Sequence, residues 1–125
     1  MGISFSNIVE NTRTAAVEFE NGEVLNVTYK PKAMSPAFFD KLNKELNKGD
    51  ETDPYAVAHM VCAIVTDWDL LGPLGEDEDG NDLVGKGEPV PVEAQYVAWV
   101  PTGILGYIIT SVAEDSSPKA KTRKR

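Results

Sequence analysis

His59 and Cys62 are the two side chains in this sequence whose chemistry could support catalysis or metal binding. They lie three positions apart, so on a helix they would face each other as a base and a nucleophile, or as two metal ligands. A zinc site needs three or four ligands, and the chain contains no other histidine or cysteine. We therefore predict that the pair is structural, with Cys62 in a helix core, that no metal or cofactor is bound, and that the protein is not an enzyme.

A dense acidic run at residues 76–82 could offer carboxylate ligands to a calcium ion. Aligning Gly80 with the glycine that a calcium-binding loop requires puts Gly75 at the first ligand position. It also puts Lys86 where a bidentate glutamate is needed, so the pattern fails. We predict instead a solvated acidic turn in which Asp79 and Gly80 form the bend.

The size and composition of the chain predict one soluble domain. At 125 residues, 42% of them hydrophobic, the chain can form one packed core but not two ordinary domains. The longest apolar runs, residues 57–65 and 97–109, are interrupted by histidine, proline and glycine, so neither provides the roughly 20 apolar residues of a membrane helix. The lone cysteine indicates a reducing cytoplasm.

The net charge of −8 at pH 7 is unevenly distributed along the chain. Five of the 12 basic residues lie in the last seven positions, which leaves 7 basic and 20 acidic residues, a net charge of −13, in residues 1–118. An acidic body repels nucleic acid phosphates, so only the basic end could contact them. We expect residues 116–125 to form a disordered, solvated tail, and we do not expect nucleic acid to be the partner.

Residues 12–29 alternate apolar and polar side chains on either side of Asn21-Gly22, which predicts a β-hairpin. A two-residue turn would pair apolar side chains with polar ones and mix the two faces. A three-residue loop over residues 20–22, with its glycine left-handed, keeps the faces apart, and we prefer this register. Its cross-strand pairs would be Val17 with Leu25, Ala15 with Val27, and Phe19 with Glu23. A further short strand is expected in residues 3–8.

Two amphipathic helices are expected next. Ser35-Pro36 opens the first, because serine can accept a hydrogen bond from a helix-end amide and proline fits the first helical position. Gly49 is expected to close it. Asp53-Pro54 opens the second helix in the same way, and its apolar spacing runs to about Thr66.

The second half of the chain changes character after Asp67. Residues 72–87 are rich in glycine and acidic side chains and are expected to form a long functional or mobile loop. A final helical region runs from Val92 to about Glu114 and is interrupted at Pro101, since proline keeps the preceding residue out of a helix. Its last part carries an apolar stripe made by Ile104, Leu105, Ile108, Ile109 and Val112.

Together these elements predict an α+β fold. An N-terminal β-hairpin or small antiparallel sheet, residues 1–31, precedes a small bundle of three to four helices, residues 35–115. Both belong to one globular domain, residues 1–115, and the basic tail, residues 116–125, lies outside it.

Trp68 and Trp99 each follow an apolar run, where tryptophan usually belongs to the core. A surface position would instead make them anchors for a partner, since the indole combines a large apolar area with a polar edge. The sequence leaves both interpretations open.

Residues 57–115 show a characteristic order of features rather than a catalytic signature. A helix ends in Val65-Thr66-Asp67-Trp68-Asp69-Leu70, an acidic turn contains Asp79-Gly80-Asn81, and Pro89-Val90-Pro91-Val92 leads to a short helix. Pro101 then opens a last helix, Ile104-Leu105-Gly106-Tyr107-Ile108-Ile109. This order resembles the tail assembly chaperones of long-tailed, siphovirus-like bacteriophages. The glycine-rich insert and the Lys/Arg tail depart from the usual pattern of that family.

The resemblance implies a protein that binds the long helical tape measure protein, keeps it soluble while tail tube subunits assemble around it, and then leaves. It also implies the cytoplasm of an infected bacterium and absence from the mature virion. Many family members are made in a second, longer form by a programmed frameshift. The implied partners are therefore the tape measure protein, the tail tube protein and a longer form of this chain, and oligomerisation is open. No catalytic residues carry over.

A tape measure helix awaiting assembly exposes apolar stripes, so a chaperone must offer a matching apolar surface on a soluble body. We place this surface on the last helix and the preceding loop, at Trp68, Trp99, Ile104, Tyr107 and Ile108. A minor structural protein of the same particle, such as a tail terminator or neck connector, is the alternative. A third class is a regulatory module that uses the acidic body or the basic tail.

Overall fold

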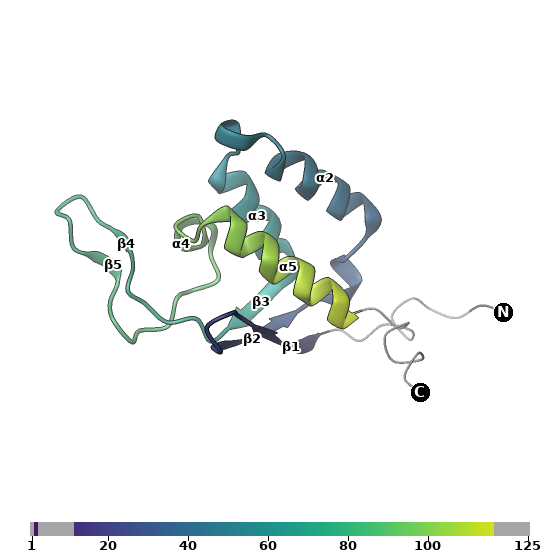
Figure 1. The fold of residues 1–125 in the computed structure, drawn as a ribbon, viewed down its shortest axis with the longest axis horizontal. Coiled ribbons are helices and arrows are strands. Elements are labelled where there is room, and N and C mark those ends of the chain that lie inside the picture. Colours follow the sequence, from purple (N-terminus) through teal and green to yellow (C-terminus); the bar gives the residue numbers. More distant parts are fainter. Residues whose placement is uncertain (1, 3–11, 117–125) are drawn as a thin grey trace.

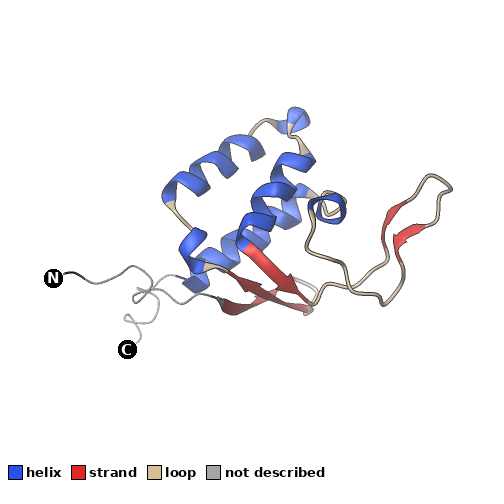
Figure 2. Cartoon of the chain, turned by 180° about the vertical axis from the view of Figure 1, so that it is seen from behind, coloured by secondary structure: helices blue, strands red, loops and turns tan. Residues whose placement is uncertain are grey.

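The computed structural model describes residue 2 and residues 12–116 of the chain. A three-stranded antiparallel sheet, in the order β1-β2-β3, lies on one side of the molecule, with the helices above it (Figure 1). The view from behind shows the helices on the same side of this sheet (Figure 2). A separate two-stranded sheet projects from the body as an arm. This mixed arrangement confirms the predicted α+β fold.

The first two strands, β1 (Arg13–Glu18) and β2 (Val24–Tyr29), form the predicted hairpin. The predicted three-residue loop is confirmed, because Gly22 has a φ of +89° and the Phe19 amide donates to the Glu23 carbonyl at 2.9 Å. The register is also confirmed, with Val17 opposite Leu25 and Ala15 opposite Val27. The strand predicted in residues 3–8 falls outside the described residues.

The first amphipathic helix begins where the sequence predicted but ends earlier. Ser35 Oγ accepts a hydrogen bond from the Phe38 amide at 3.1 Å, as expected for a helix N-cap. The helix ends at Leu46 rather than at Gly49, which has a φ of +64° and begins a short 3₁₀ turn instead. The elements in this part are η1 (Pro31–Ala33), α2 (Pro36–Leu46), η2 (Gly49–Glu51) and α3 (Pro54–Ile64).

The prediction that the second helix continues to Thr66 is wrong, because α3 ends at Ile64 and a strand, β3 (Val65–Trp68), follows directly. Val65 is extended, with φ −84° and ψ 127°, and pairs with Tyr29 of β2. β-Branched side chains fit a strand at least as well as a helix. Pairing with the open edge of β2 satisfies backbone groups that a longer helix would leave unpaired on that edge.

The glycine-rich segment, residues 72–87, is a β-hairpin rather than a loop, and we call it the arm. Its strands are β4 (Leu74–Glu76) and β5 (Asp82–Val84), so the loop that the sequence predicted within the helical region, residues 35–115, contains two paired strands. The turn explains the difference, because Asp77 Oδ1 accepts hydrogen bonds from the Asp79 and Asn81 amides, both at 2.9 Å. The predicted acidic turn is present, with Gly80 at a φ of +84°.

The last helical region is interrupted at Pro101 as predicted, and consists of α4 (Ala94–Val97) and α5 (Thr102–Ser116). α5 extends one residue past the predicted domain end at 115, and the rest of the predicted tail lies outside the described residues. The C-terminal end of α5 is fixed to the sheet by Asp115. Its Oδ2 atom accepts hydrogen bonds from Tyr29 Oη at 2.6 Å and from Arg13 Nε at 3.2 Å.

One contiguous core lies between the three-stranded sheet and the helices. Alternate residues of β1 and β2 face it, and each helix adds the apolar side of its surface. Its largest fully buried side chains are Tyr29, Ile64, Leu105, Ile108 and Ile109. No helix in the described part of the chain is long and apolar enough to cross a membrane.

Candidate functional site

Two of the five residues predicted to contact a partner, Trp68 and Ile108, are buried instead. Trp68 is the last residue of β3, and its indole Nε1 donates a hydrogen bond to the Val90 carbonyl at 2.8 Å. Its ring is therefore buried in the core and its polar edge is already bonded within the molecule. Ile108 is 1% exposed, because it lies on the same side of α5 as Leu105 and Val112, which pack against the core. These two placements correct the sequence prediction.

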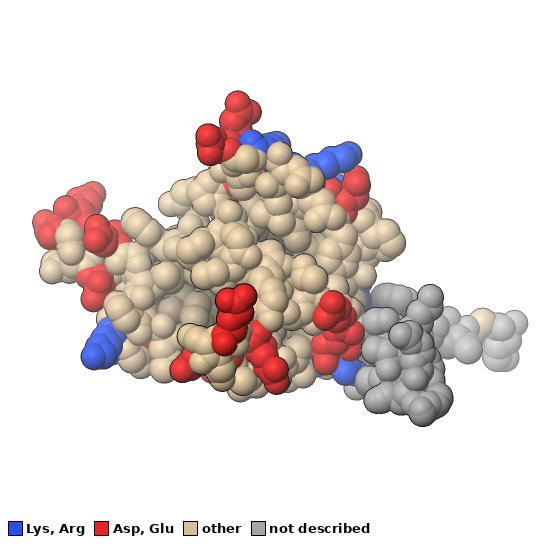
Figure 3. Space-filling view, viewed as in Figure 1, with Lys and Arg blue, Asp and Glu red and all other residues tan. Residues whose placement is uncertain are grey.

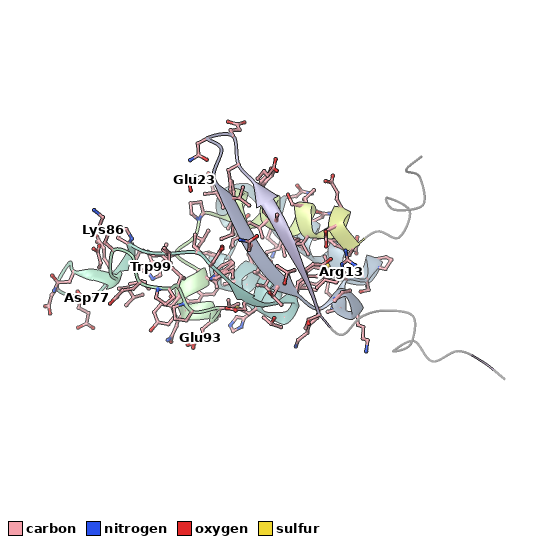
Figure 4. All side chains as sticks on the ribbon, turned by 90° about the horizontal axis from the view of Figure 1, so that it is seen from below. Arg13, Glu23, Asp77, Lys86, Glu93 and Trp99 are labelled. Atoms are coloured by element: carbon pink, nitrogen blue, oxygen red, sulfur yellow. The ribbon has the colours of Figure 1, made fainter. Side chains whose placement is uncertain are left out.

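Trp99 is exposed, but it lies apart from the other predicted contact residues. Seen from below, it sits beside the arm, whereas Glu23 marks the β1–β2 loop at a different part of the surface (Figure 4). A Cβ atom added to Gly75 of the arm would lie 3.0 Å from the Trp99 ring. Trp99 therefore supports the arm through close packing on a glycine.

Ile104 and Tyr107 are the two predicted residues that the structure brings together on the surface. They lie one turn apart on α5, with exposed fractions of 42% and 46%. With Phe19, Glu20, Asn21 and Gly103 they line a hollow of about 520 Å³, which we call the α5 hollow. The hollow lies between the β1–β2 loop and the first turns of the helix.

A contact between the hairpin and α5 holds the walls of the α5 hollow together. The Phe19 and Tyr107 rings pack with their centroids 5.4 Å apart and tilted by 51°. The Tyr107 hydroxyl donates a hydrogen bond to the backbone carbonyl of Glu18. The loop and the helix are therefore joined by an apolar and a polar contact.

A second hollow, which we call the strand hollow, lies on the other side of the same loop. It has a volume of about 430 Å³ and shares Phe19 and Asn21 with the α5 hollow. Val24 and Leu71 on its wall are 48% and 56% exposed, so two apolar side chains lie next to each other on this open wall. Its remaining lining residues are Glu23, Leu25, Asp69 and Leu70.

We call the two hollows and the loop between them the hairpin surface, and acidic side chains form its rim. Glu20, Glu23 and Asp69 lie among its lining residues, whereas none of the described lining residues is lysine or arginine. Hydrogen bonds from the side chain and backbone of Asn26 hold the pKa of Asp69 below its usual value, so this carboxylate is charged at neutral pH. Acidic side chains also gather over the hairpin in the space-filling view (Figure 3).

Sequence reasoning missed most of the hairpin surface, including its apolar residues Phe19, Val24 and Leu71. Val24 had a detectable signal, since it follows the turn on the outward side of the hairpin alternation. Leu71 follows Leu70 directly and precedes Gly72-Pro73, a position where the chain leaves the core. Phe19 had no such signal, because its partner Tyr107 is far away in the sequence.

The His59 and Cys62 pair lies on α3, away from the hairpin surface. His59 is exposed and Cys62 is half-buried against the core. Burial raises the pKa of the Cys62 thiol, and the Glu93 carboxylate adds to the rise, so the thiol stays protonated at neutral pH. In the part of the chain that the structure describes, no three His, Cys, Asp or Glu side chains are grouped to hold a metal ion.

The fold and the hairpin surface define a small α+β protein with an apolar, acid-rimmed surface. Such a surface can provide burial for apolar side chains and attraction for cations. Comparison with protein-family models, with curated proteins and with solved structures found no match.

Proposed function

We propose that this protein is a phage tail assembly chaperone that binds the tape measure protein and keeps it soluble while the tail tube assembles. The observation that carries the proposal is the hairpin surface, where Ile104, Tyr107, Val24 and Leu71 are each about half exposed beside two hollows. The order of sequence features over residues 57–115, which resembles that family, supports it further.

The physical basis of the proposed activity is temporary burial of an apolar stripe. A tape measure helix without its tube exposes apolar side chains that would otherwise drive aggregation. The hollows can take up such side chains, and the net charge of −8 keeps the complex soluble. The protein acts by binding rather than catalysis, in the cytoplasm of the infected bacterium, and leaves before the virion is complete.

The test is co-expression of the chain with the tape measure protein of the same phage, using one charged substitution on each of two helices. Ile104→Asp places a carboxylate in the α5 hollow. Tyr55→Asp is the matched control, because Tyr55 is also about half exposed but lies at the start of α3, at the end of that helix away from the sheet. We expect Ile104→Asp to reduce co-purified, soluble tape measure protein about tenfold, and Tyr55→Asp to leave it unchanged.

Circular dichroism and thermal unfolding should show that both variants are folded. Ile108 is unsuitable for this experiment, because a charge at a fully buried position would disrupt the core. Equal co-purification by Ile104→Asp and the wild type would show that the contact lies elsewhere. Failure of the wild type to hold the tape measure protein would contradict the chaperone function. Detection of this chain itself in purified particles by mass spectrometry would contradict it too.

A further inference from the structure

We infer that the two hollows of the hairpin surface act together as one docking site for an amphipathic helix whose apolar stripe is flanked by lysine or arginine side chains. The inference rests on the proposed function in taking the partner to be a long helix. It goes further in naming the chemistry of the segment that is bound and the side of the molecule that binds it.

The shape of the hairpin surface suits a helix that lies across the loop. Phe19 and Asn21 belong to both hollows, so the loop stands between them as a ridge. A helix can accept a ridge in the groove between neighbouring rows of side chains. Apolar side chains from the rows on either side would then enter the α5 hollow and the strand hollow, where Ile104 and Leu71 are exposed to meet them.

The charge of the rim selects for basic side chains beside the apolar stripe. Glu20 borders the α5 hollow, and Glu23 and Asp69 border the strand hollow, so acidic groups stand on both sides of the loop. With no basic side chain among the described lining residues, a bound acidic helix would meet repulsion without compensation. A helix with flanking cations would be attracted instead.

The surface is already held in shape before a partner arrives. Asn21 Oδ1 accepts a hydrogen bond from the Glu23 amide at 3.0 Å, which fixes the loop. Asn26 Nδ2 donates to Asp69 Oδ2 at 2.9 Å, which holds that carboxylate on the rim. Fewer groups must then be ordered on binding, and the free energy of binding is correspondingly more favourable.

The basic end of this same chain is a poorer occupant of the site. Residues 117–125 carry five basic side chains but no apolar side chain larger than proline, so they match the rim without filling the hollows. They could extend about 30 Å from Ser116, which is longer than the roughly 22 Å of α5, so reach alone does not exclude them. The experiment below therefore includes removal of these residues.

The test titrates the full chain with three synthetic helical peptides of about 20 residues by isothermal calorimetry. The first has a leucine stripe flanked by lysines, the second has the same stripe flanked by glutamates, and the third has serines in place of the leucines with the lysines kept. We expect the first peptide to bind at least about tenfold more tightly than either of the others. Equal affinity of the first and third would mean charge attraction alone and would overturn the proposal.

Substitutions locate the binding on the hairpin surface. Glu20→Gln with Glu23→Gln should weaken binding of the first peptide about fivefold and reduce its salt dependence. Asp50→Asn with Glu51→Gln is the control, since it removes the same charge from exposed side chains of η2, and should change binding less than twofold. Val24→Ser with Leu71→Ser should weaken binding about tenfold, and Tyr55→Ser should not.

Each remaining outcome is decisive. Equal effects of the rim and control substitutions would place the helix elsewhere and overturn the inference. Removal of residues 117–125 should leave affinity within about twofold, and a tenfold increase would identify these residues as the occupant instead. Binding of the first peptide as expected, together with no binding of the tape measure protein, would contradict the proposed function while supporting the site. If the Val24→Ser, Leu71→Ser variant held as much tape measure protein as the wild type, the proposed function would be supported and the proposed site contradicted.

Discussion

Tyr29 is the side chain whose single polar atom ties the sheet to the last helix. It is fully buried, and its hydroxyl donates to Asp115 at 2.6 Å across the layer between β2 and α5. We expect Tyr29→Phe to lower the free energy of unfolding by about 2 kcal/mol, because it removes a hydrogen bond to a charged acceptor while keeping the ring. Urea unfolding measures the change. An unaltered free energy of unfolding would mean that the Arg13 contact alone holds Asp115.

The same hydrogen bond should make stability depend on alkaline pH. Burial, and then the Asp115 carboxylate, raise the pKa of Tyr29 well above its usual value. An unfolded tyrosine loses its proton near pH 10, so above about pH 10 ionisation stabilises the unfolded state, and the contribution of Tyr29 to the free energy of unfolding is lost as pH rises. The difference between wild type and Tyr29→Phe should be constant from about pH 7 to 9 and shrink by about pH 11. Unfolding curves at each pH test this, and a constant difference would contradict it.

The exposed and buried residues of α5 show how far the sequence could predict the site. The apolar stripe from Ile104 to Val112 was readable, because its spacing is helical. The exposed edge of the stripe could not be predicted, since the spacing alone does not say which of its five positions the core buries. Ile104 lies at one edge of the stripe, beside the exposed Tyr107, whereas Ile108 and the other members of the stripe are buried. Only the position of the hairpin beside the helix decides which edge stays exposed.

At the scale of elements, the base of the arm depends on the absence of a side chain at Gly72. A Cβ atom there would lie 2.4 Å from the Gly85 carbonyl oxygen and 2.7 Å from that of Val84. We expect Gly72→Ala to destabilise the protein by about 1–3 kcal/mol, because backbone atoms must move to make room. Thermal unfolding, with amide spectra of the arm, measures the effect.

Gly103 provides the matched control for this glycine. An added Cβ atom would meet no atom within 4 Å, and the residue lies in the first turn of α5. Gly103→Ala should therefore raise the free energy of unfolding by about 0.5 kcal/mol, since alanine favours the helix. Equal destabilisation by both substitutions would mean that the crowding at Gly72 is not the cause.

The helices and strands were predictable from the sequence where local signals were complete. They were not predictable where strand pairing with a distant segment determined the structure. The hairpin register followed from Gly22 and the alternation around it, and the start of α2 followed from Ser35-Pro36. β3 was missed because Ile64-Val65-Thr66 suits either a helix or a strand. Its choice depends on the open edge of β2, which lies nearly 40 residues earlier in the chain.

At the scale of the whole molecule, the hairpin surface exists because segments from three parts of the chain meet. The β1–β2 loop, the segment after β3 and the start of α5 each supply part of its wall. No local pattern predicts that Phe19 will pack against Tyr107, because the contact depends on how the whole helical layer lies on the sheet. The binding residues were therefore only partly predictable from the sequence.

The arm is a second projecting part of the molecule, and it should be separable from the body and from the hairpin surface. Its base is anchored by buried Val84 and by Trp99, whereas residues 77–81 at its tip are exposed and bond only with one another (Figure 4).

Replacing residues 77–81 by Asn-Gly joins the Glu76 and Asp82 pair through a turn that suits a hairpin. We expect Tm to change by less than about 2 °C, because no core contact is removed. Tape measure protein should still co-purify, because the hairpin surface is intact. Loss of co-purification with an unchanged Tm would instead assign the contact to the acidic tip of the arm.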